Sequence, residues 1–310
     1  MSSRPLLPPA PRTRRLTAAL ACGLAAVALA PAGPPGADAR GRVVPRPVPA
    51  SDQDAPYPVR SAIAVERGLA YGAGAWTALD VYRRADAGLR PAVIVLHGGG
   101  WRGGTRGHTA PLSEALARAG FVAVNVDYTL STLWRPGFPR QLREVRSAVR
   151  FVRRNAARLG VDPRRIGAIG SSAGAHLSAL LGTVGRGSLG VGARVRAAVL
   201  WSAPLDLLAL DRHPLHGIVD QLVGCVPRAC AGRRLDASPT HHVSPDDAPM
   251  LIVNSERELV PASQARRMAA RMTRAGVRNR LWLLPGGGHA RDYEHVMLGP
   301  SIAFLRRNLR

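Results

Sequence analysis

The sequence contains no lysine and few aromatic residues. Its 43 strongly basic residues are therefore all arginine, and with only 20 acidic residues they give a formal net charge of +23 at pH 7. The arginines are spread over predicted helix faces and do not cluster with aromatic side chains, which indicates a solvated surface and argues against nucleic-acid recognition. Such a surface can adhere weakly to anionic polymers or lipid headgroups, and added salt would abolish that adhesion. The absence of a Gly-Lys-Ser/Thr sequence argues against a nucleotide-binding P-loop.

Cysteine is also scarce, with three residues in the whole chain. Cys22 lies near the N-terminus, which leaves Cys225 and Cys230 as a local pair. Their spacing is not that of a zinc site and no second pair exists, so we predict no metal site and no organic cofactor. In an oxidising compartment the pair would form a disulfide across a short loop, and two free thiols are the alternative.

A long hydrophobic run is missing as well, since the apolar stretch Leu16 to Ala30 is shorter than the ~20 residues of a membrane-spanning helix. Arginines precede this stretch and Ala37-Asp38-Ala39 follows it, a pattern typical of a secretory signal peptide that is cleaved near Ala39. We therefore predict a signal peptide over 1–39, a disordered linker over 40–58, a folded domain over 59–310, and secretion. A retained membrane anchor is the main alternative, although the sequence predicts no stable membrane span, and the choice between general and twin-arginine export stays open.

Short apolar runs recur along the predicted domain and alternate with helical stretches. The candidate strands are Ala92 to Leu96, Phe121 to Val126, Arg165 to Ile169, Val195 to Trp201, Met250 to Val253 and Leu281 to Leu284. Two earlier segments, Ile63 to Tyr71 and Ala78 to Tyr82, predict an antiparallel pair at a sheet edge. The alternation predicts an α/β fold with a mostly parallel, doubly wound sheet and helices on both faces.

Two helices are well defined by their apolar spacing and their ends. Gln141 to Leu159 carries an apolar stripe at steps of three and four residues, and Gly160 is its expected C-cap. Pro261 to Ala275 begins with proline and stops at Gly276. The segment between the strands ending at Trp201 and starting at Met250 is longer than a simple crossover requires, so it predicts a small lid above the sheet.

Gly170-Ser171-Ser172-Ala173-Gly174 joins a predicted strand directly to a helical run. So tight a corner leaves no room for side chains two residues before and after Ser172, which explains Gly170 and Gly174. We interpret the segment as a nucleophile elbow with Ser172 as nucleophile, where N–H groups at the helix N-terminus favour negative charge. An ordinary turn is the alternative.

A second glycine-rich loop, His97-Gly98-Gly99-Gly100-Trp101, follows the strand that ends at Leu96. Consecutive glycines let backbone amides approach a substrate oxygen without interference from side chains. We predict an oxyanion hole formed by the N–H groups of Gly99, Gly100 and Ala173. Trp101 would wall the substrate pocket or pack against the loop.

Loops after the last two predicted strands supply a candidate base and a candidate acid. His289 ends Pro285-Gly286-Gly287-Gly288-His289, and an imidazole titrates near neutrality, so His289 is the predicted general base. The preceding loop holds Glu256 and Glu258 and no aspartate. Glu258 is the predicted acid that orients the imidazole, and Glu256 is the alternative.

Together these motifs resemble those of the α/β-hydrolases, and in particular bacterial carboxylesterases related to bifunctional acetylxylan and feruloyl esterases. The hormone-sensitive-lipase group and the arylformamidases are more distant likenesses. The resemblance covers Leu79 to the C-terminus and rests also on Asp127-Tyr128-Thr129-Leu130-Ser131 and Ser202-Ala203-Pro204-Leu205-Asp206-Leu207. It implies a Ser-His-acid triad at Ser172, His289 and Glu258, although aspartate is the commoner acid in the family.

We therefore expect a secreted serine hydrolase that cleaves small-molecule or carbohydrate esters through an acyl-enzyme, with short acyl groups preferred. No nucleic-acid partner is expected, and the sequence does not predict the oligomeric state. An amidase or arylformamidase with the same triad is the enzymatic alternative. A non-catalytic binding module with the same fold is the alternative from another class.

Overall fold

The computed structural model describes residues 62–310, with the exception of residue 87 and residues 226–229. The predicted signal peptide, its cleavage site, Cys22 and the predicted linker lie outside the described residues. No helix among the described residues is both long and apolar enough to cross a membrane.

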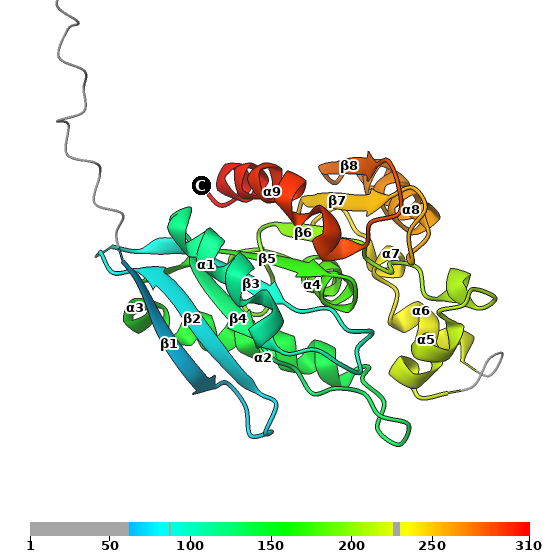
Figure 1. Ribbon diagram of the computed structural model, residues 1–310, viewed down its shortest axis with the longest axis horizontal. Coiled ribbons are helices and arrows are strands. Elements are labelled where there is room, and N and C mark those ends of the chain that lie inside the picture. The colour runs from blue at the N-terminus through cyan, green and yellow to red at the C-terminus, as the bar shows by residue number, and fades with distance from the viewer. Residues whose placement is uncertain (1–61, 87, 226–229) are drawn as a thin grey trace, which may run out of the picture. The chain divides into compact units, whose positions relative to one another are not determined.

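One eight-stranded sheet runs through the domain in the order β1-β2-β4-β3-β5-β6-β7-β8 (Figure 1). Its strands are β1 (Ile63–Ala70), β2 (Ala78–Arg84), β3 (Arg90–Leu96), β4 (Val122–Val126), β5 (Val161–Ser171), β6 (Ala198–Trp201), β7 (Met250–Ser255) and β8 (Asn279–Leu284). The pairs β1–β2 and β2–β4 are antiparallel, and all the other pairs are parallel. The predicted mostly parallel sheet with an antiparallel pair at one edge is confirmed.

Helices connect the strands. They are α1 (Ala110–Arg118), α2 (Arg140–Arg154), α3 (Ala156–Leu159), α4 (Ala173–Thr183), α5 (His216–Val223), α6 (Ala231–Asp236), α7 (Pro239–His242), α8 (Ala262–Arg274) and α9 (Glu294–Asn308), with the 3-10 turns η2 (Arg106–Thr109), η3 (Leu208–Leu210) and η4 (Ala290–Tyr293). Alternate residues of one strand show that both faces of the sheet are covered. Ile94 of β3 packs in a buried cluster with α2 and α4, whereas Val95 packs in another with α1 and α9. The doubly wound α/β architecture is therefore confirmed.

The boundaries of several elements differ from the predicted ones. β5 extends to Val161–Ser171 because it pairs with β3 and β6 beyond the apolar core of the run, whereas β6 begins only at Ala198. The predicted helix from Gln141 breaks at Asn155, whose ψ of 17° leaves the helical region, and continues as the short α3. Gly160 ends α3 with a φ of +68°, as its predicted role as a C-cap requires.

The predicted lid segment folds into η3, α5, α6 and α7. Its apolar side chains, among them Leu207, Leu215 and Val219, form a buried cluster with Trp101 and Ala173. Cys225 and Cys230 of this segment are paired, with their Cα atoms 6.0 Å apart, a separation that a disulfide can span. The segment therefore covers the two glycine-containing loops that the sequence singled out.

Parallel pairing brings all the predicted site segments to one edge of the sheet. β3, β5, β6, β7 and β8 are neighbours in the sheet and run in the same direction. The loops after their carboxyl ends hold His97–Trp101, Ser172, Ser202, Glu258 and His289. Open α/β sheets bind their ligands at this edge.

Candidate active site

Ser172 occupies a strained corner between β5 and α4. Its φ is +52°, and its N–H donates to the carbonyl of Trp201 at 2.7 Å. A Cβ atom on Gly170 would lie 2.4 Å from a backbone atom of Gly174, and one on Gly174 would lie 2.1 Å from the carbonyl oxygen of Leu96. Both positions therefore exclude every side chain, which is the steric reason that the sequence predicted for this corner.

A cavity of about 170 Å³ opens beside Ser172. Gly99, Gly100 and Ala173 line it together with Ser172. The rest of the wall is mainly apolar and consists of Trp101, Arg102, Pro204, Leu215, Ile218, Leu259 and Val260. A larger cavity of about 460 Å³ between β8 and α9 contains none of the predicted site residues. We therefore place the candidate site at the smaller cavity, which Ser172 lines together with the predicted oxyanion residues.

The three predicted oxyanion donors are free to bind a ligand. Within the described residues, none of the N–H groups of Gly99, Gly100 and Ala173 donates a hydrogen bond. Gly99 has a φ of +120°, and a Cβ atom there would lie 2.2 Å from the carbonyl oxygen of Gly103. The loop conformation thus requires glycine at this position, and both Gly99 and Gly100 line the cavity beside Ser172.

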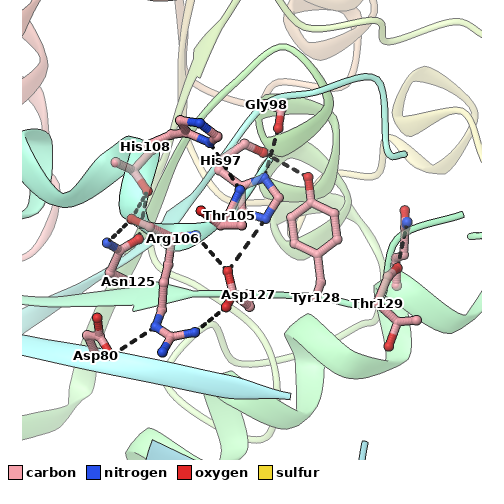
Figure 2. A network of polar contacts seen from close by, with 12 residues as sticks. Asp80, His97, Gly98, Thr105, Arg106, His108, Asn125, Asp127, Tyr128 and Thr129 are labelled. Carbon is pink, nitrogen blue, oxygen red and sulfur yellow. Dashed lines mark hydrogen bonds and ion pairs between the residues drawn. The ribbon is translucent and has the colours of Figure 1, made fainter. Parts of the chain in front are cut away.

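We call residues 97–101 the oxyanion loop. An aromatic stack and an ion-pair network hold its first residue, His97 (Figure 2). The imidazole of His97 stacks on the ring of Tyr128 with centroids 4.3 Å apart, and the Tyr128 hydroxyl donates to the His97 carbonyl at 2.8 Å. Asp127 accepts from the backbone N–H of Arg106 at 2.6 Å and pairs with its guanidinium, which also donates to Asp80 at 2.9 Å. Burial lowers the pKa of His97, so the stacked imidazole stays neutral.

The imidazole of His289 pairs with the carboxylate of Glu258. Nδ1–H of His289 donates to Oε2 of Glu258, and this leaves Nε2 of His289 without a hydrogen-bond partner within the described residues. The other carboxylate oxygen, Oε1, accepts from the N–H of Ser255 at 2.9 Å and from the hydroxyl of Ser202 at 2.8 Å. The carboxylate is fully buried and its position is fixed by three donors.

The alternative acid does not reach the imidazole. Glu256 is exposed, and its side chain makes no hydrogen bond or ion pair among the described residues. Only its backbone N–H is engaged, as a donor to Leu284 at 3.0 Å. The structure therefore brings Glu258, and not Glu256, to His289.

Ser202 links Glu258 to the loop that carries His289, a role that the sequence does not predict. Its hydroxyl oxygen accepts from the N–H of Ala290 at 2.7 Å and lies 2.6 Å from the hydroxyl of Tyr293. Because the Ser202 hydroxyl donates its proton to Glu258, Tyr293 must be the donor of that pair. Burial raises the pKa of Tyr293, which keeps the phenol protonated for this role.

Ser172 and His289 are anchored to adjacent residues at the end of β6. Ser172 is held by the carbonyl of Trp201, and the residue after His289 is held by the hydroxyl of Ser202. No hydrogen bond joins Ser172 Oγ to His289 in the described part of the chain. In enzymes without bound substrate such contacts are often long and tighten only in the complex.

Backbone strain marks the same region. Among the described residues, the non-glycine residues with positive φ are Trp101, Ser172, Ser202 and Ala290. Trp101, Ser172 and Ala290 are predicted site residues or neighbours of one, and Ser202 contacts both Glu258 and the loop that carries His289. Strained conformations persist where the surrounding structure enforces them, and they cluster at functional sites.

His176, in α4, is a buried link between two segments of the site. The indole N–H of Trp101 donates to its Nδ1 at 3.1 Å, and its own Nε2–H donates to the carbonyl of Ala237 at 2.7 Å. Burial lowers the pKa of His176 to about 4. A neutral imidazole therefore connects the oxyanion loop, α4 and the lid.

Metal ligands do not converge anywhere in the described residues: no group of three or more His, Cys, Asp or Glu side chains could hold a metal ion.

Comparison with known proteins adds an independent view of this site. The model of the BD-FAE family matches residues 79–272, which include the oxyanion loop, Ser172 and Glu258. The esterase LipC of Mycobacterium tuberculosis is 32% identical over 254 residues, which are 76% of this chain and 62% of LipC. This chain spans about half to three-fifths of the length of the curated relatives that it matches first, from 47% to 62%.

Solved structures agree on the fold. A thermophilic esterase of Thermogutta terrifontis, solved with propionate bound, is 27% identical with a TM-score of 0.64, over 80% of this chain and 94% of that chain. A truncated carbohydrate esterase from gut microbiota reaches a TM-score of 0.71 at 24% identity, over 81% of this chain and 98% of that chain. The second likeness bears on the fold alone.

Proposed function

The chain belongs to the BD-FAE family of α/β-hydrolases, and from that premise we propose that it hydrolyses carboxylic esters with Ser172 as nucleophile, His289 as general base and Glu258 as the orienting acid. One observation carries the proposal. The cavity beside the strained Ser172 is lined by Gly99, Gly100 and Ala173, whose amides make no hydrogen bond in the described part of the chain. The His289–Glu258 pair is held through Ser202, which follows β6, the strand next to β5. A nucleophile, a base with an orienting acid and an oxyanion hole together suit acyl transfer.

In the first half-reaction Ser172 Oγ attacks the ester carbonyl while His289 Nε2 takes the hydroxyl proton. The carbonyl oxygen becomes an oxyanion and accepts from the amides of Gly99, Gly100 and Ala173. Each such donor is worth about 3 kcal/mol of transition-state stabilisation in other hydrolases. When the tetrahedral intermediate collapses, the carbon–oxygen bond of the ester breaks and His289 returns the proton to the departing alcohol.

In the second half-reaction a water molecule attacks the acyl-enzyme. His289 takes a proton from that water and later gives it to Ser172 as the carboxylic acid leaves. Glu258 holds the imidazole with Nδ1 protonated and Nε2 free, and it stabilises the imidazolium that forms in each step. No step requires a metal or an organic cofactor.

Short acyl groups are the proposed substrates. The cavity of about 170 Å³ is small and its wall is mainly apolar, with Leu215, Ile218 and Val260 among its residues. A cavity of this size suits acetyl to butyryl groups and leaves no room for a long hydrocarbon chain. We extend the proposal to acyl groups carried by carbohydrates because the sequence motifs resemble those of acetylxylan and feruloyl esterases.

Secretion is part of the same proposal. The N-terminal sequence has the pattern of a signal peptide, and a Cys225–Cys230 disulfide would form and persist only in an oxidising compartment. Mass spectrometry of the exported protein tests both features at once. It should find a new N-terminus near residue 40 and a mass two hydrogens lower across the two cysteines.

A panel of aryl esters from acetyl to long-chain acyl groups, with anilides matched to the short members, tests the activity. We expect the acetyl to butyryl esters to be cleaved best, with the anilides far slower. Ser172→Ala should abolish hydrolysis, whereas Ser188→Ala, at an exposed serine away from the site, should not. Faster cleavage of the anilides would support the amidase alternative, and hydrolysis that survives Ser172→Ala would refute the assigned nucleophile.

A further inference from the structure

Two large apolar side chains stand out in solvent on the turn between β4 and α2. Leu133 is 82% exposed and Trp134 is 89% exposed. Other large apolar residues that are exposed in the described part of the chain reach at most 59%, and Trp76 reaches 43%. We call these two residues the Leu133–Trp134 tip. An adjacent Leu and Trp this exposed are costly in water unless something covers them.

The turn that displays the tip is closed by hydrogen bonds. The N–H of Thr132 donates to the carbonyl of Arg135 at 3.0 Å, and the N–H of Arg135 donates back to Thr132 at 3.3 Å. Just before the turn, the N–H of Ser131 donates to the carbonyl of Trp101 at 2.8 Å. The tip therefore projects from a turn with defined geometry, tied at its base to the oxyanion loop.

The turn is also attached to the lid. The N–H of Phe138 donates to the carbonyl of Leu222 at 2.9 Å, and Gln221 donates to the carbonyl of Ser131 at 3.3 Å. Pro136 packs closely on Gly224, where an added Cβ atom would lie 2.2 Å from the proline ring. These lid contacts come from the end of α5, the helix that also contributes Ile218 to the wall of the Ser172 cavity. Anything that binds the tip is therefore held beside the active-site lid.

The segment that carries the tip contains basic and no acidic side chains. Residues 128–143 contain Arg135, Arg140 and Arg143 and no acidic residue. Arg135, next to the tip, is exposed and makes no ion pair within the described residues. The chain as a whole carries a formal net charge of +23. A partner of this surface should therefore be anionic as well as apolar.

These features together select the partner. Leucine gains free energy when it leaves water for an apolar environment such as the hydrocarbon of a bilayer. Tryptophan favours the boundary between that hydrocarbon and water, and arginine binds anionic headgroups. A polysaccharide could stack on Trp134 but offers nothing to Leu133, and a soluble polyanion offers charge without a hydrocarbon phase. We propose that the Leu133–Trp134 tip inserts into the interface of an anionic lipid bilayer and docks the protein peripherally, with the lid side of the active site near the membrane surface.

Sedimentation with lipid vesicles tests the proposal without any use of enzymatic activity. The full chain and its variants share the same N-terminal segment, so differences between them report on the tip. With vesicles of phosphatidylcholine and phosphatidylglycerol, the double variant Leu133→Ser/Trp134→Ser should bind at least about tenfold more weakly than the wild type. Trp76→Ser, at a partly exposed tryptophan on the β1–β2 hairpin, is the matched control and should bind like the wild type.

A second readout locates Trp134 directly. Brominated lipids should quench part of the tryptophan fluorescence of the wild type, and Trp134→Phe should remove that part. Thermal unfolding of all variants in the absence of lipid should match that of the wild type, because the substituted side chains are exposed.

Three results would overturn the proposal. The first is wild-type affinity of the double variant for anionic vesicles, which would reduce the interaction to the general positive charge. The second is equal binding of the wild type to vesicles of phosphatidylcholine alone, which would remove the requirement for anionic lipid. The third is an absence of vesicle binding, including the case in which the wild type binds an insoluble polysaccharide through Trp134 instead.

Discussion

The two halves of the candidate active site are held in place in different ways. Backbone packing positions the nucleophile and the oxyanion hole, since Gly174 lies so close to the Leu96 carbonyl that not even a methyl group fits between them. Side-chain hydrogen bonds position the acid and the base, since Ser202 connects Glu258 to the loop after His289. An added side-chain atom at Gly170 or Gly174 should therefore prevent correct folding of the first half. Loss of single hydrogen bonds in the second half should lower activity stepwise.

Among variants that keep the fold, the largest loss of activity should come from the acid in the half that depends on side chains. Glu258→Gln removes the charge that stabilises the imidazolium and disturbs the tautomer of His289, so kcat for a short-chain aryl ester should fall by about 10²- to 10⁴-fold. Glu256→Gln is the matched control, because Glu256 is exposed and unpaired in the described residues, and its kcat should stay within about twofold of the wild type. If the two variants lost equal activity, Glu258 would not be the specific partner of the base.

The half that depends on backbone packing should respond to a single methyl group. Gly174→Ala places Cβ 2.1 Å from the carbonyl oxygen of Leu96, so we expect a loss of about 3–5 kcal/mol in the free energy of unfolding, or failure to fold. Gly299→Ala in α9 is the control, since a Cβ there meets nothing within 4 Å and alanine favours a helix by up to about 1 kcal/mol. Denaturation in urea measures both. Equal stability of Gly174→Ala and the wild type would contradict the steric account.

His176 connects the half that depends on backbone packing to the lid through hydrogen bonds with Trp101 and Ala237. Its buried imidazole should make the free energy of unfolding depend on pH. Its folded pKa of about 4 lies below the ordinary value of 6.5, so the unfolded chain takes up the proton first as the pH falls. The stability that it contributes is complete above pH 6.5 and declines until about pH 4, by about 3 kcal/mol in total. The difference in the free energy of unfolding between wild type and His176→Gln, measured over this range, should shrink accordingly. A difference independent of pH would refute a neutral, buried His176.

The smallest effect should come from Ser202→Ala. The substitution removes the hydroxyl that donates to Glu258 and accepts from the N–H of Ala290, and a lost buried partner costs about 1–3 kcal/mol. Activity should fall by about tenfold while KM changes little, because the base is displaced and the cavity is kept. Ser188→Ala serves as the control for both stability and rate. An unchanged rate in Ser202→Ala would mean that the acid and base hold their positions without this link.

The same contrast explains what the sequence could predict. Gly170 and Gly174 are local to Ser172, so the steric demand of a strand-to-helix corner is visible in five consecutive residues. The sequence after β7 likewise narrows the acid to Glu258 and Glu256, and the structure brings Glu258 to His289.

The role of Ser202 could not be predicted from local sequence. It depends on β6 lying between β5 and β7, which is set by pairing between strands far apart in the chain. The tie from Trp101 through His176 to Ala237 likewise joins three segments that meet only in the folded protein. The exposure of Leu133 and Trp134 could not be predicted from the sequence either, because an apolar dipeptide can face the core or the solvent.

Labelling with a fluorophosphonate, followed by peptide mass spectrometry, tests the central claim most directly, because the reagent bonds to an activated serine hydroxyl. We predict one adduct on the peptide that contains Ser172, its loss in Ser172→Ala, and much slower labelling in His289→Ala. Labelling of Ser172→Ala at the wild-type rate, or an adduct on another residue of the wild type, would contradict the account.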